Sequence, residues 1–253
     1  MKTLALKLVL TPMLIGLASL AGCKWGAAVS GWLVGLPLTS APITLFLALE
    51  QGPAFASSAA QGILFGLVSV AVFCLAYSWL AFRLSWLPTM LAGWLAFFVA
   101  TFFLQKVSPA LATTFIGVFI VLAVAFKLLP VRDDSAVAAT APRWDVPARM
   151  VIATAFVLLL TGLADVLGAR LSGLLAPFPV FGTILAVFTH RFQGATAAAR
   201  LLRGVVLGSF SFAAFFLVIA LMIERAGILA AFICATVTAL TLHGLSLLLL
   251  QKT

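Results

Sequence analysis

Long apolar runs fill most of this 253-residue chain, and only short polar stretches separate them. A helix needs about 20 apolar residues to cross the hydrocarbon layer of a membrane, so each run predicts one spanning helix. We predict about nine of them, over Ala5–Gly22, Ala27–Leu49, Ala59–Phe82, Trp86–Leu104, Pro109–Leu129, Ala148–Ala164, Ala169–Phe192, Ala199–Ile223 and Gly227–Leu250. The predicted fold class is an all-α integral membrane protein.

One polar stretch, Pro130–Pro147, interrupts this pattern and is rich in Arg and Asp. Such a stretch between apolar runs is typical of a loop, and we take it as the boundary between domains. The chain then divides into a first four-helix unit over 1–105, a linking helix with the polar loop over 106–146, and a second four-helix unit over 147–253.

Composition narrows the class further, because 64% of the residues are hydrophobic and only 8% are charged. A soluble domain could not keep its surface hydrated with so few polar residues. The net charge of +9 does not indicate a nucleic-acid partner, since the basic residues lie in short loops and at the ends of apolar runs. The cysteines are isolated and lack the spacing of metal ligands, so we expect no metal and no cofactor.

The beginning of the chain resembles a bacterial lipoprotein signal, because Leu20–Cys23 has the form of a cleavage site. The stretch Lys7–Leu17, however, has an internal counterpart at Arg149–Leu159, where cleavage would serve no purpose. We therefore predict that the first helix is retained.

An internal repeat relates the two four-helix units, with a constant offset of 142 in the numbering. The matches include residue types that are scarce in an apolar chain, namely Gly31 with Gly173, Pro37 with Pro179, Gln51 with Gln193, Gly52 with Gly194, Gly62 with Gly204, Ser69 with Ser211 and Arg83 with Arg225. Close helix packing alone explains some shared glycines but not a register without gaps. We infer a duplication.

The number of helices predicts how the duplicated units are oriented. One helix between two four-helix units turns the second unit upside down, which gives the inverted-topology repeats of secondary transporters. Ten Lys and Arg residues fall on the side of the C-terminus and five on the other side. By the positive-inside rule, the C-terminus and the polar loop are cytoplasmic.

Each unit also resembles a known family. The residues GLL at 173–175 followed by FPVF at 178–181 resemble the GlpM family of small bacterial inner-membrane proteins, and the first unit fits the same pattern less closely, at Gly31, Pro37, Glu50, Gly52 and Leu87–Pro88. The first unit has Leu36 and Thr39 where the second has Phe178 and Phe181, and Phe192 replaces the acidic Glu50. The resemblance implies a tandem-duplicated, multi-pass protein of the bacterial inner membrane, and it implies no defined activity.

Pro37 and Pro179 lie near the centres of their predicted spans. Proline removes a backbone hydrogen bond from a helix, and a membrane tolerates the freed groups only where protein or a water-filled cavity satisfies them. The candidate substrate-binding residues are therefore Ser30, Pro37, Thr39, Ser40, Ser172, Pro179 and Thr183. The alternative is that both prolines only kink helices for packing.

Polar and ionisable groups at the ends of the two proline-containing spans are the candidates for proton coupling or gating: Glu50, Gln51, His190 and Gln193. Each of them could instead be a helix-end residue that reaches the membrane surface. His243 lies alone in the last span, where we expect a hydrogen bond to a neighbouring helix rather than a metal.

We find no sequence motif of an enzyme. The scarcity of charge inside the spans predicts a secondary transporter or exporter of a small neutral, zwitterionic or amphipathic solute. Two alternatives stay open, which are a lipid flippase or scramblase and a membrane scaffold or accessory subunit without transport. The expected partners are membrane lipid and a small-molecule substrate, and a homodimer is left open.

Overall fold

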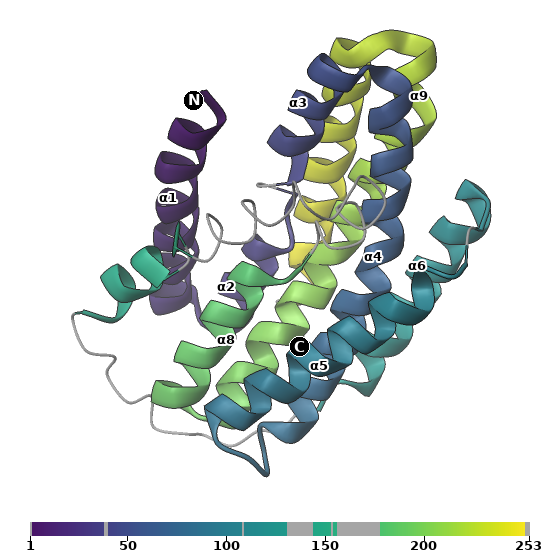
Figure 1. Ribbon diagram of the computed structural model, residues 1–253. Coiled ribbons are helices and arrows are strands. Elements are labelled where there is room, and N and C mark those ends of the chain that lie inside the picture. Colours follow the sequence, from purple (N-terminus) through teal and green to yellow (C-terminus); the bar gives the residue numbers. More distant parts are fainter. Residues whose placement is uncertain are drawn as a thin grey trace.

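The computed structural model describes residues 2–37, 40–107, 109–130, 144–152, 154–155 and 178–250. All regular structure in these ranges is helical. Figure 1 shows the helices, which are α1 (Lys2–Trp25), α2 (Ala27–Val34), α3 (Ser40–Gln51), α4 (Pro53–Leu80), α5 (Trp86–Leu104), α6 (Leu111–Leu128), α8 (Val180–Gln193) and α9 (Ala195–Leu250). Residues 145–152 are helical as well.

Within the described ranges, four helical segments are long and apolar enough to cross a membrane: Pro53–Leu80, Trp86–Leu104, Leu111–Leu128 and Ala195–Ser246. The protein is therefore all-helical in its described part and has the character of a multi-pass membrane protein, as the sequence predicts. The predicted span Ala27–Leu49 is divided into α2 and α3 around Pro37. Helix α4 begins at Pro53, before the predicted start at Ala59. Polar side chains in its first turns bond to neighbouring segments: Ser57 Oγ donates to the Ala220 carbonyl at 3.1 Å, and Gln61 Nε2 donates to the Pro109 carbonyl at 2.8 Å.

Single glycines connect consecutive helices at four points. Gly26, Gly52, Gly194 and Gly227 have φ of 93°, 91°, 88° and 80°, and they are the positive-φ residues of the described chain. A Cβ added at any of them would meet nothing within 4 Å, so the backbone conformation rather than lack of space requires glycine. With ψ near 170°, these residues occupy a region that only glycine adopts readily.

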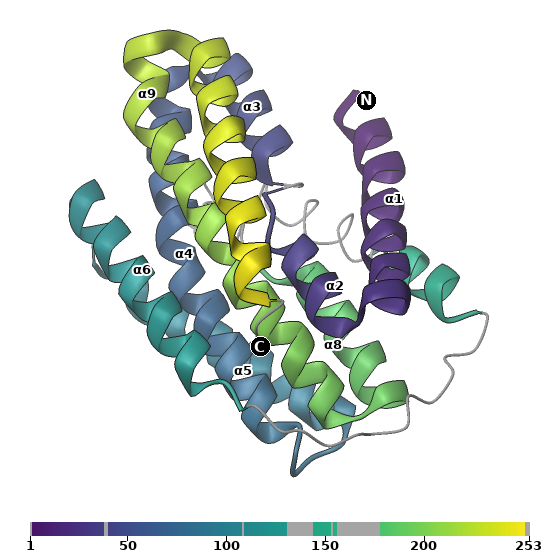
Figure 2. The same ribbon diagram turned by 180° about the vertical axis from the view of Figure 1, so that it is seen from behind.

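The reversal at Gly227 divides α9 into a first arm, residues 195–226, and a second arm, residues 228–250. Figures 1 and 2 show the two arms side by side and running in opposite directions. The first arm also lies along α4 and is antiparallel to it (Figure 1). The centre of the molecule lies between these two helices, where the side chains of Leu64, Phe73, Leu202 and Phe216 are buried.

Glycines also bring α2 against the first arm of α9. A Cβ on Gly31 would overlap the Leu201 carbonyl, and a Cβ on Gly204 would overlap the Ala28 carbonyl. One turn further along, Gly35 and Gly208 meet in the same way. Two small-xxx-small faces therefore cross with their backbones in contact, a packing that membrane helices use widely.

The outer faces of α5, α6 and the second arm of α9 are apolar and exposed, for example at Leu95, Phe103, Ile116 and Leu229. An apolar surface of this extent suits contact with lipid chains rather than water. Helices α5 and α6 pack against α4 on its far side from α2 (Figure 2).

Candidate functional site

The first proline break lies between α2 and α3. Helix α2 ends with the Gly35 N–H bonded to the Gly31 carbonyl at 3.2 Å, and the Ala41 N–H at the start of α3 bonds to the Pro37 carbonyl at 2.9 Å. Ser30, Pro37 and Ser40 are buried. Thr44 Oγ1, one turn into α3, donates to the Ser40 carbonyl of its own helix at 2.8 Å.

The second break precedes α8. The Val180 N–H bonds to the Phe178 carbonyl at 2.7 Å, and Pro179 has φ −79° and ψ 60°. These values define an inverse γ-turn with Pro179 at its centre. The turn directs the Phe178 ring onto α5, where it stacks on Phe98 with ring centroids 5.5 Å apart.

Thr183, in the first turn of α8, is the predicted site residue that the structure brings to a cavity. Its Oγ1 accepts a hydrogen bond from Trp94 Nε1 of α5 at 3.3 Å. Ser30, Pro37, Ser40 and Pro179 are buried but line neither of the two pockets described below. Thr39 and Ser172 lie outside the described residues.

The predicted coupling residues are dispersed over helix ends. Glu50 is in the last turn of α3, and its side chain lies outside the described part; Gln51 is exposed and Gln193 is half-buried. His190 is half-buried in α8, with Nδ1 3.5 Å from the Tyr77 hydroxyl of α4.

A cavity of about 330 Å³ lies between α5, α8 and residues 144–152. We call it the aromatic groove. Three residues on one face of α5 line it, Trp86, Met90 and Trp94, and α8 lines it from Val180 to Phe192. Trp144 and Ile152 close a further side. Small-molecule sites typically have volumes of about 300 Å³ or more and an apolar lining with few polar groups, and the groove meets both conditions.

Charge is confined to one end of the aromatic groove. Arg191, in the last turn of α8, is the charged residue among those that line it. The guanidinium carbon lies 5.5 Å from the centroid of the Trp86 ring and 5.7 Å from that of Phe192. Trp86 and Trp144 also lie at helix ends, where tryptophan is enriched at the membrane surface.

A buried ion pair lies next to the groove. Arg149 and Asp145 are joined by two contacts, Nη2 to Oδ2 at 2.8 Å and Nε to Oδ1 at 3.0 Å. The Arg149 guanidinium also lies 5.2 Å from the centroid of the Phe188 ring, which lines the groove. The charge of Arg149 is thus neutralised, whereas Arg191 forms no ion pair with any described residue.

A separate polar cluster joins α2 to both arms of α9. His243 stacks on Trp32 with centroids 3.7 Å apart, and its Nδ1 lies 2.8 Å from Ser211 Oγ. Ser211 donates its own hydrogen to the Gly208 carbonyl, so the Nδ1–H of His243 donates to Ser211. The expected helix-to-helix bond of His243 is confirmed. At the positions 142 residues earlier in the sequence, Thr101 Oγ1 donates to Ser69 Oγ at 2.9 Å.

Sequence reasoning missed the tryptophans and Arg191 of the groove. One signal could have found part of it, because Trp86, Met90 and Trp94 recur at every fourth position and so share a face of one helix. The described residues contain no group of three or more His, Cys, Asp or Glu side chains suited to hold a metal.

Comparison of the chain with protein-family models, with curated proteins and with solved structures gives no match. The GlpM resemblance therefore stays a prediction from the sequence.

Proposed function

We propose that the protein is a secondary transporter of small amphipathic solutes and that the aromatic groove is its solute site. One observation carries this proposal: an apolar cavity runs along α8 from the proline turn to a cation at the helix end. Such a cavity suits a molecule with an apolar body and a polar head. A non-transporting scaffold has no need of it.

We further propose that two four-helix units of inverted topology build the transporter, with nine spans in total and α6 as the link. Three features support this arrangement. Gly52 and Gly194, which are equivalent in the repeat, have the same backbone conformation. The bonds Ser69–Thr101 and Ser211–His243 recur at that same offset. The equivalent helices α4 and the first arm of α9 run in opposite directions (Figure 1).

The proposed location is the bacterial inner membrane, with the C-terminus in the cytoplasm. The charge bias of the loops and the GlpM resemblance are the basis for it. In this orientation the end of the groove at Arg191 faces the cytoplasm, because Arg191 is one of the ten basic residues on the side of the C-terminus.

The test is transport by purified protein in liposomes, with single-chain fluorescent amphiphiles that carry anionic, zwitterionic or neutral heads. Met90→Trp fills the groove from α5, and Leu91→Trp places the same bulk on the exposed face of that helix. We expect Met90→Trp to slow translocation roughly tenfold or more, an effect of about 1.4 kcal/mol on the barrier, and Leu91→Trp to leave it unchanged.

Equal rates in the two variants would reject the groove as the solute site. A wild-type chain that is folded, by circular dichroism, and moves none of these probes would favour the scaffold. Movement of two-chain phospholipids at the same rate as single-chain probes would favour the flippase or scramblase.

A further inference from the structure

We propose that the aromatic groove binds a single-chain carboxylate, such as a free fatty acid, with the carboxylate on Arg191 and the chain between α5 and α8. This inference rests on the proposed function only in treating the bound carboxylate as a transported solute. Binding itself can be measured without transport. The shape of the groove, its charge and its counterpart in the other half of the chain support it.

The inner end of the groove suits an apolar chain. Val180 and Phe192 are separated by twelve residues of α8, or about 18 Å at the helical rise of 1.5 Å per residue. The polar pair at the inner end, Trp94 and Thr183, is satisfied by its own hydrogen bond. A ligand therefore meets rings and aliphatic side chains there, such as Met90, and a second polar head would be desolvated without a partner.

The outer end suits one anionic head. The guanidinium of Arg191 is close to the rings of Trp86 and Phe192, and contacts with its face leave its edge N–H groups available. One guanidinium fork matches one carboxylate with two parallel hydrogen bonds. Asp145 balances the charge of the nearby Arg149, whereas Arg191 has no ion partner among the described residues. The positive charge of Arg191 would therefore repel a cationic head.

The size of the cavity favours one chain over two. A volume of about 330 Å³ is at the lower limit of the range of about 300–1,000 Å³ that is usual for small-molecule pockets. Residues from α5, α8 and the 144–152 segment line it on three sides. A phospholipid would have to leave its second chain outside.

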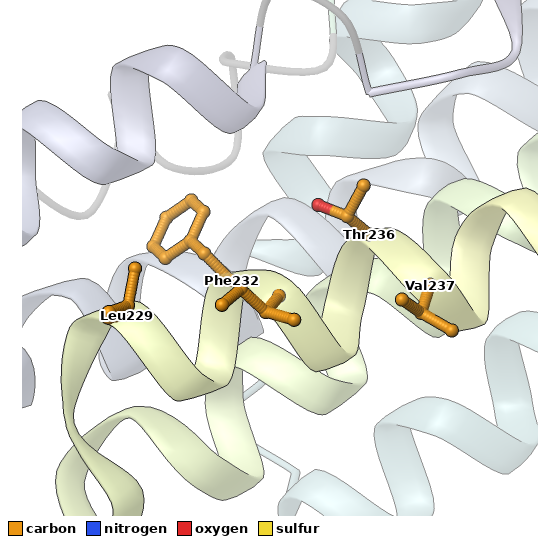
Figure 3. Close-up of a pocket in the computed structure, with 5 residues that line it drawn as sticks. Leu229, Phe232, Thr236 and Val237 are labelled. Carbon is orange, nitrogen blue, oxygen red and sulfur yellow. The ribbon is translucent and has the colours of Figure 1, made fainter.

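The second half of the repeat has only a shallow, open pocket at the equivalent register, and it lacks the cation. This pocket lies on the second arm of α9 alone; Figure 3 shows Leu229, Phe232, Thr236 and Val237 along it. Phe232 and Thr236 are the counterparts of Met90 and Trp94, at an offset of 142. The position equivalent to Arg191 is Leu49, so we assign the anion site to one half only.

The experiment measures binding to the full chain in nanodiscs of zwitterionic lipid. The probe is a brominated fatty acid, which quenches nearby tryptophans, and the matched probe is its methyl ester, which has the same chain and no charge. We expect the acid to bind more tightly than the ester by roughly tenfold or more, because the ester lacks the charge that the two hydrogen bonds to Arg191 require.

Arg191→Gln should remove the preference for the acid, whereas Arg83→Gln should keep it. Arg83 is exposed in the turn before α5 and does not line the groove, so it controls for surface charge. Met90→Trp should weaken both probes, which separates loss of the chain site from loss of the head site.

Equal affinities of acid and ester would overturn the proposal. The same loss in Arg83→Gln and Arg191→Gln, or tighter binding of a brominated two-chain anionic phospholipid, would also overturn it. Binding of the acid with no transport would keep this inference and reject the proposed function. Transport of neutral and zwitterionic amphiphiles with no preference for the acid would keep the function and reject this inference.

Discussion

The crossing of α2 with α9 and the interface of α5 with α8 are both contacts between helices of the two halves, and they are built differently. At the crossing, glycines bring the backbones together and leave no space for a Cβ. At the α5–α8 interface, large rings hold the helices apart around a cavity. Close backbone contact fixes the relative position of two helices. The rings between α5 and α8 leave a volume that a ligand can occupy. Four substitutions test this contrast, in order of decreasing effect.

Gly204→Leu should have the largest effect, because the Ala28 carbonyl lies where its side chain would begin and backbone cannot rotate away. We expect a loss of about 4 kcal/mol or more in the free energy of unfolding, measured by circular dichroism during denaturation in detergent. Gly117→Leu on α6 is the control, since a Cβ there meets nothing within 4 Å.

Under the inverted-repeat proposal, Gly62 is the counterpart of Gly204, and Gly62→Leu should be equally harmful. A Gly62→Leu variant as stable as Gly117→Leu would argue against it.

Asp145→Asn comes next, because it leaves the buried Arg149 without its ion partner next to the groove. Removing one member of a buried pair costs about 3 kcal/mol or more. The double variant Asp145→Leu with Arg149→Met should recover most of this stability in the same unfolding assay. Equal instability of the single and double variants would mean that the pair stabilises the fold through the packing of its side chains and not through charge compensation.

Gly194→Ala should cost about 2 kcal/mol, from backbone conformation alone, since nothing surrounds the added methyl. Thermal unfolding measures this, and Gly52→Ala should lose the same amount because the two residues share one conformation. Gly244→Ala is the control, as it lies within the second arm of α9 with open space around it. A loss no greater than that of the control would show that the reversal tolerates a side chain.

Trp94→Phe should have the smallest effect on stability. It keeps an aromatic ring and removes the N–H that donates to Thr183. Hydrogen bonds between membrane helices contribute about 0.6 kcal/mol on average. A double-mutant cycle with Thr183→Val measures the coupling between the two side chains. No coupling would mean that the two side chains meet without contributing to the position of α8.

Several features of the fold could be predicted from the sequence. The predicted offset of 142 pairs Gly52 with Gly194, which share one backbone conformation, and Ser69 with Ser211, which each bond to a side chain of another helical segment. Pro37 predicted the break between α2 and α3, because proline cannot continue a hydrogen-bonded turn. The glycine and proline features depend on local backbone chemistry, which a sequence records directly.

The aromatic groove was not predictable in the same way. A span that is apolar all round does not indicate which face meets another helix. The contact of Trp94 with Thr183 joins residues far apart in the chain and depends on the packing of α5 against α8. A hydroxyl in an apolar span does not by itself mark a cavity either, because Thr44, close to Pro37, bonds to the backbone of its own helix.

The single-glycine connections have a mechanical consequence. A link of one residue leaves no loop between two helices, so α3 and α4 can turn relative to one another only about Gly52, and α8 and α9 only about Gly194. Movement between helices is taken up at such hinges, which are a few residues at the ends of elements. Pro37, between the end of α2 and the start of α3, is another such position, and it lies beside Gly35, where α2 packs against α9. A small rotation of α3 about Pro37 would therefore displace the far end of α3 more than the end that adjoins α2.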